Sequence, residues 1–173
     1  MHPYRSSFLA ALVCLVGAAS ALAQANPRGT ATVALDQATV SVEYGRPSLK
    51  GRAVNDLLGK LKPGAFWRLG ADRATTLSTD KDLRFGEVAV PTGQYSLWAQ
   101  RTENGWNLVF NKQHGQWGTQ HDPGQDVASA ALKEEKAASS EDMVTLSLSR
   151  IASGGQLTIQ WGELKLSANF AAK

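Results

Sequence analysis

The chain has 173 residues, a formal net charge of +3 at pH 7, and hydrophobic residues at 43% of its positions. A balance this close to neutrality lacks the basic surface typical of proteins that bind nucleic acid or anionic membranes, so we expect neither partner. Cys14 is the only cysteine, and we therefore expect the fold to rest on a hydrophobic core without disulfides.

Residues 1–23 have the features of a secretory signal peptide. Arg5 supplies the positive start, Phe8 to Val16 form the apolar core, and Ala21-Leu22-Ala23 is a small-residue cleavage box. The apolar core is shorter than the roughly 20 residues that a membrane-spanning helix needs. We therefore expect residues 24–173 to form a single domain, periplasmic or secreted, with no stable membrane anchor after cleavage.

Beyond Thr30, apolar residues recur at every second position, which is typical of strands with one buried face. The expected inward-facing sets are Val40, Val42 and Tyr44; Tyr95, Leu97 and Ala99; Trp106, Leu108 and Phe110; Val144, Leu146 and Leu148; Leu157, Ile159 and Trp161; and Leu164, Leu166, Ala168 and Phe170. Turn residues separate them at Pro91–Gly93, Glu103–Gly105, Ser153–Gly155 and Gly162–Glu163. The pattern predicts an all-β fold, a single antiparallel β-sandwich of jelly-roll type.

Three segments depart from this alternation. Ala53–Leu61 places apolar residues at helical spacing and predicts one short helix. Val127–Ala138 combines helix-forming composition with a position between strands, and both assignments stay open. Lys112–Gln125 has no periodicity, and a loop of this length in a compact domain is often functional.

Four blocks in order carry a resemblance to a known family: YGRPSLKGR, FWRLGADRATTL, VPTGQYSLWA and WNLVFNKQHGQWGTQHD. Over about Tyr44 to Asp126 the chain resembles the bacterial family called domain of unknown function 2911. The resemblance implies an exported β-rich domain of the bacterial envelope and brings no activity, substrate or cofactor. Two positions depart from the family pattern: Asp72 replaces its usual asparagine, and His121 replaces a common aromatic residue.

The first block contains three candidate anion-binding cations, Arg46, Lys50 and Arg52. Such a group suits a carboxylate, sulfate or phosphate, because arginine offers a bidentate fork. The alternative is a solvated turn whose cations pair with Glu43 or Asp56.

The second block contains Trp67 and Arg68. One interpretation packs the indole inward while the guanidinium faces a cleft. In the other, Arg68 pairs with Asp72 and only holds the turn together.

The loop after Phe110 supplies Asn111, Lys112, His114 and Trp117, which we expect at a rim of the sandwich where ligands bind. His114 and His121 lie near acidic residues, yet their spacing matches no metal-binding signature, so no metal and no cofactor is predicted.

The tryptophans divide into two groups by the alternation of the strands. Trp106 and Trp161 share faces with aliphatic residues and are expected in the core. Trp98 and Trp117 are the candidates for exposed rings that stack on a sugar.

Two functional hypotheses and a plainer third follow. The favoured one is a non-catalytic envelope module that binds an anionic small molecule or a saccharide through this basic and aromatic rim. The alternative is an envelope hydrolase in which His114 acts with a nearby carboxylate, with or without a metal. The third is a structural or partner-binding domain. Whether the protein is an enzyme stays open, although no Gly-x-Ser-x-Gly nucleophile motif occurs and no cysteine remains after cleavage.

Overall fold

The computed structural model describes residues 26–173, so the predicted signal peptide lies outside the described residues. Strands dominate these residues, as the alternation predicted. The elements are β1 (Arg28–Ala34), β2 (Thr39–Gly45), α1 (Val54–Leu58), β3 (Phe66–Trp67), β4 (Thr76–Thr79), β5 (Leu83–Phe85), β6 (Val88–Val90), β7 (Gly93–Arg101), β8 (Trp106–Asn111), the 3₁₀ helix η1 (Pro123–Gln125), β9 (Asp126–Ile151) and β10 (Gly154–Ala172).

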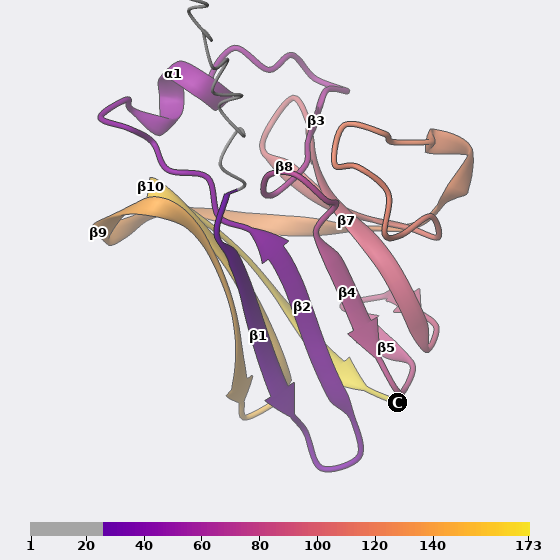
Figure 1. Cartoon of the computed structure of the whole chain (residues 1–173). Helices are drawn as coiled ribbons and strands as arrows, with labels where there is room; N and C mark the ends of the chain where they lie inside the picture. The colour runs from indigo at the N-terminus through magenta and orange to yellow at the C-terminus, as the bar shows by residue number, and fades with distance from the viewer. Residues whose placement is uncertain (1–25) are drawn as a thin grey trace, which may run out of the picture.

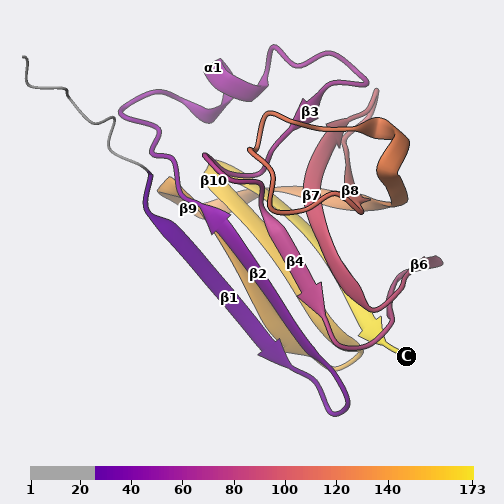
Figure 2. The same cartoon turned by 45° about the vertical axis from the view of Figure 1, so that its right-hand side comes forward.

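All strand pairs are antiparallel, in the order β1-β2-β4-β7-β8-β9-β10-β5-β6, with β3 also paired to β7. The sheet bends so strongly that β1 and β2 lie in front of β9 and β10 (Figures 1 and 2). The hydroxyl of Tyr44 in β2 crosses between the two layers and donates to the carbonyl of Leu146 at 3.1 Å. The predicted all-β class and sandwich-like architecture are confirmed.

The segment Val127–Ala138, which composition left open, is strand. It belongs to β9, which pairs first with β8 up to Leu132 and then with β10. Two neighbouring strands complete its backbone hydrogen bonds in turn, and this tertiary pairing outweighs the helix propensity of its alanine, lysine and glutamate residues.

The turn predicted at Gly162–Glu163 is wrong, because β10 runs through it without reversing. The pairing register with β9 shifts on both sides of Gly162, which marks a bulge, and Gly162 itself has φ 58°. The strand bends there and stays paired with β9, since the same two strands are hydrogen-bonded before and after the bulge.

The core lies between the two layers of the bent sheet and contains the predicted inward-facing residues. Phe110, Leu97, Leu108 and Ile159 are among its fully buried members. Burying one side chain of this kind contributes about 1.5–3 kcal/mol, so the core accounts for a chain without disulfides.

Helix α1 confirms the predicted helix in a shorter form. The carboxylate of Asp56 accepts a hydrogen bond from the Ala53 amide at 3.1 Å, and the amide of Gly59 ends the helix on the Asn55 carbonyl at 2.9 Å. Leu58 points into the core.

Figures 1 and 2 place α1 and the loop that holds η1 at the same end of the molecule, opposite the C-terminus. Among residues 26–173, no helix has the length and hydropathy needed to cross a membrane.

Candidate functional site

The cations of the first block serve the backbone around them. The guanidinium of Arg46 donates to the Val144 carbonyl and to the Thr145 hydroxyl, both at 3.3 Å, and so joins the end of β2 to β9. Arg52 donates from Nε to the carbonyl of Leu49 at 2.9 Å, and Lys50 is exposed on the same turn. The expected pairing with Glu43 or Asp56 does not occur, because Arg28 pairs with Glu43 at 2.7 Å and Asp56 caps α1.

In the second block the tryptophan packs inward, as the first interpretation expected. The Trp67 ring is buried and stacks on Trp161 at a centroid distance of 5.8 Å and an angle of 11°. Arg68 lies beside the Gln116-Trp117-Gly118 turn, close to Gly118. Among the described residues no ion pair joins Arg68 to Asp72, whose carboxylate instead accepts from the amide of Asn26 at 2.9 Å.

Asn111 organises the long loop from a fully buried position. Its side-chain nitrogen donates to the carbonyl of Asp122 and to the carboxylate of Asp126, both at 2.7 Å, and its oxygen accepts from the amide of Gln113 at 2.9 Å. Lys112, which follows it, is exposed. Hydrogen bonds from the Gln125 side chain and the Gly124 amide hold the pKa of the Asp122 carboxyl below its usual value.

His121 is held at the base of the same loop. Its Nε2 lies 2.9 Å from the Asp126 carboxylate, and its ring lies against Phe66 and Trp98 at centroid distances of 4.2 and 4.6 Å. The imidazole is almost enclosed, so it packs the loop onto the sheet.

The structure corrects one tryptophan assignment and confirms the others. Trp98 is only 3% exposed, because the long loop covers the outer face of β7, so the prediction of an exposed ring there is wrong. Trp117 is 51% exposed, as predicted, while Trp106 and Trp161 are buried in the core. His114 is exposed and lines a different cavity from the one described next.

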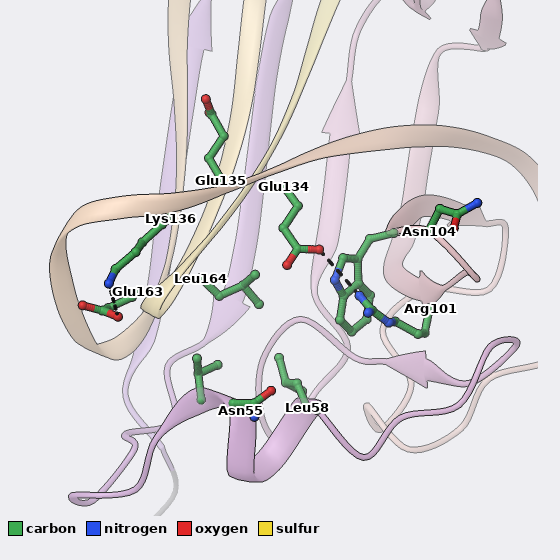
Figure 3. A pocket seen from close by; sticks show the side chains of 12 residues that line it. Asn55, Leu58, Arg101, Asn104, Glu134, Glu135, Lys136, Glu163 and Leu164 are labelled. Atoms are coloured by element: carbon green, nitrogen blue, oxygen red, sulfur yellow. Dashed lines mark ion pairs between the residues drawn. The ribbon is translucent and has the colours of Figure 1, made fainter.

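A cleft of about 610 Å³ lies between α1, the β7–β8 hairpin and the bent part of β9 and β10 (Figure 3). Its apolar wall consists of Val54 and Leu58 from α1 and Leu164 from β10. Amide side chains are present on both sides, from Asn55 on α1 and Asn104 in the β7–β8 turn. The bulge at Gly162 lies close against α1, since an added Cβ there would lie 3.3 Å from Val54.

Four of the five charged side chains that line the cleft form two ion pairs. Arg101 lies 3.5 Å from Glu134, and Lys136 lies 3.1 Å from Glu163 (Figure 3). Glu135, between the two β9 residues, points away from α1. The hydrogen bond and the charge of Lys133 lower the pKa of the Glu135 carboxyl. The cleft is therefore lined by two positive and three negative side chains, and Lys133, 2.8 Å from Glu135, supplies the counter-charge of the third carboxylate.

Trp106 contributes an unused donor to this cleft. The guanidinium carbon of Arg101 lies 5.0 Å from the centroid of its indole ring, a cation–π arrangement. The ring is 4% exposed, and its Nε1–H has no acceptor among the described residues. A buried donor without a partner costs about 1–3 kcal/mol, a cost that a water or ligand acceptor reaching it would relieve.

Residue by residue, the structure brings only part of the predicted rim together, since Arg68 lies beside the Trp117 turn and other members lie elsewhere. His114 lines a separate cavity, Arg46 and Arg52 bind backbone, and none of the nine predicted residues lines the cleft under α1. Sequence reasoning missed Arg101, Glu134 and Glu163. The only signal for Arg101 was its place at the end of a strand before the Glu103–Gly105 turn. Among residues 26–173, no group of three or more metal-ligating side chains is clustered.

The fold and the cleft define an all-β domain with a charge-balanced cavity at one end. A model of the family described as protein of unknown function (DUF2911) matches residues 26–170, and the chain therefore belongs to this family. The resemblance found in the four sequence blocks is confirmed. No curated protein and no solved structure matches the chain.

Proposed function

We propose that this protein is an exported, non-catalytic binding domain and that the cleft under α1 takes a neutral, hydroxyl-rich ligand, a saccharide. The observation that carries the proposal is the charge balance of the cleft. Its two ion pairs and two amides surround an apolar wall and leave no single charge without a counter-charge.

A saccharide matches this mixture of groups. After forming one contact each, the guanidinium of Arg101 keeps further N–H donors and the carboxylate of Glu134 keeps further lone pairs. Neighbouring hydroxyls of a sugar both donate and accept, so they satisfy such paired groups without bringing a charge. The apolar C–H face of a sugar ring suits Leu58 and Leu164.

Export follows from the signal peptide expected at residues 1–23. We place the mature domain, beginning at Gln24, in the periplasm or outside the cell, where saccharides of envelopes and biomass are present. Mass spectrometry of the protein recovered from the periplasmic fraction of a bacterial host tests this step. A measured mass that corresponds to a chain beginning at Met1 contradicts export with cleavage.

The binding test is a titration of the mature domain with neutral cello-, malto- and chito-oligosaccharides, followed by calorimetry and by ¹H–¹⁵N spectra of the indole groups. The chain has five tryptophans, and a Trp106→Phe variant assigns the Trp106 signal. We expect one series to shift the Trp106 Nε1–H resonance. Because the ligand is uncharged, its affinity changes little between low and high salt.

Matched variants separate the cleft from the rest of the surface. Arg101→Met and Glu134→Gln remove one partner each of the same ion pair, and we expect roughly tenfold weaker binding from each. Arg84→Met is the control, because Arg84 forms an ion pair with Glu87 and neither of these residues lines the cleft. The proposal fails if no oligosaccharide binds, or if Arg84→Met weakens binding as much as Arg101→Met.

A further inference from the structure

A second cavity lies on the solvent face of β1, β2 and β4, the face that points away from the core. Its volume is about 320 Å³. The inward-facing residues of these strands fill the core, so the residues between them face outward and line this cavity. Those are Thr30, Ser41, Thr76 and Ser78, joined by Gln94 from β7.

The strand register sets these hydroxyl groups in a row. Ser41 is directly opposite Ser78, and Ser78 is directly opposite Gln94. The Gln94 amide donates to the Ser78 oxygen at 3.2 Å, which leaves the Ser78 hydroxyl hydrogen free to donate to another group. The Thr76 hydroxyl donates to the Ala74 carbonyl at 3.2 Å, so the hydroxyl donors that the floor offers are those of Thr30, Ser41 and Ser78.

Cationic side chains stand around this floor. Arg28 uses its Nε for Glu43, at 2.7 Å, and keeps its other donors. Arg73 lines the cavity and has no carboxylate within ion-pair distance among residues 26–173. His114 completes the wall and makes no side-chain hydrogen bond within the described part of the chain. With Glu43 offset by Arg28, Arg73 leaves the cavity with one net positive charge before His114 is counted.

An exposed aromatic ring stands beside this charge. Arg73 and Trp117 are partners in an isolated antiparallel bridge, and side chains of directly opposed residues project to the same side. Two backbone hydrogen bonds flank the bridge, from Ala74 to Gln116 at 3.0 Å and from Gly118 to Asp72 at 2.7 Å, so the pair is held in place. Nothing in the core requires a half-exposed tryptophan at this position.

We infer that this cavity is an oxyanion-binding site, separate from the cleft under α1, for a small molecule that carries a carboxylate, sulfate or phosphate group. Arg73 supplies the fork that such a group accepts, the hydroxyl row supplies further donors, and Trp117 covers the flat part of the molecule. The site combines His114 and Trp117, which the sequence singled out, with Arg73, which it did not.

The experiment is a titration of the mature domain with inorganic phosphate and, separately, with glucuronate, at constant ionic strength. Histidine ring resonances report the result, because the mature domain contains only His114 and His121. We expect the His114 signals to move in a saturable way while those of the enclosed His121 stay in place. Thermal shift alone is a poor readout, since phosphate also stabilises proteins by exclusion from their surfaces.

Two variants show whether the oxyanion is free or belongs to an acidic sugar, and which residue binds which portion of the ligand. Arg73→Gln weakens both probes, we expect by tenfold or more, whereas Arg84→Gln leaves both unchanged. If the ligand of the site is an acidic sugar, Trp117→Ala lowers the affinity for glucuronate and leaves the affinity for phosphate unchanged. If Trp117→Ala changes neither affinity, the ligand is the free oxyanion. The inference is overturned if neither probe moves the His114 signals, or if the Arg73→Gln variant binds both probes as tightly as the unmodified domain does.

Discussion

Arg101 and Trp106 occupy the two ends of the β7–β8 turn and lie in contact, with the guanidinium carbon 5.0 Å from the indole centroid. The same guanidinium reaches Glu134 on β9 at 3.5 Å. One side chain therefore covers the tryptophan and joins two strands across the cleft. The contact is partly exposed, which limits its contribution to stability and leaves it open to a ligand.

Replacing Arg101 with methionine should cost little stability. A cation–π contact and an exposed ion pair contribute about 1 kcal/mol or less each at such a site. We expect the free energy of unfolding in urea to fall by about 1 kcal/mol, against a change within about 0.5 kcal/mol for Arg84→Met. A loss of several kcal/mol would make Arg101 a structural residue and weaken its assignment to a binding cleft.

Trp67 and Trp117 should differ sharply on substitution. Trp67→Ala removes a buried ring stacked on Trp161 and is expected to cost about 3–5 kcal/mol. Trp117→Ala removes a ring that is half exposed and should change stability by no more than about 0.5 kcal/mol. Urea denaturation of both variants measures the difference, and similar losses would contradict the structure.

Gly45, in the first of the four sequence blocks, lies against Ala71 of the second block, and alanine does not fit there. An added Cβ would lie 2.1 Å from the carbonyl oxygen of Ala71, a backbone atom. We expect Gly45→Ala to destabilise the domain by about 1–3 kcal/mol or more, because the backbone must shift.

Gly124→Ala is the matched control for that substitution. Its new Cβ meets only the flexible Asp122 side chain, at 3.2 Å. Comparing the melting temperatures of both variants with that of the unmodified domain tests the contact, and an unchanged melting temperature for Gly45→Ala would show that the two backbones do not approach in this way.

Tyr95 should make stability depend on alkaline pH. Burial, and then the charge of Asp82, raises the pKa of its hydroxyl above the ordinary value of 10.0. The folded protein therefore favours the neutral phenol, which donates to the Pro91 carbonyl at 2.8 Å. Its contribution is complete below pH 10.0 and is lost as the pH rises through the folded-state pKa.

Denaturation at pH 8 and at pH 10.5 measures this loss. Tyr95→Phe keeps the ring and removes the titrating group, so the fall in stability between the two pH values should be smaller in the variant. An equal fall in both proteins would assign the alkaline sensitivity to other groups.

Several local features were predictable because they depend on neighbours in the chain. The alternation of Val40, Val42 and Tyr44 places them inward wherever β2 pairs, and β2 ends at Gly45, two residues before Pro47. The helix near Val54–Leu58 followed from helical spacing. The assignment of Trp98 failed because alternation reports only that a residue is on the outer face of a strand. It does not report that a distant loop covers this face.

The sequence by itself determined the fold class, the faces of most strands, the short helix and the family, since all of these are written in local spacing and in short ordered blocks. Only the tertiary structure decided which strands pair, and with them both cavities. Arg101 meets Glu134, and Arg73 meets Trp117, because the fold places segments far apart in the chain side by side. Partner choice between strands depends on the packing of the whole core, so no local pattern specifies where these side chains meet.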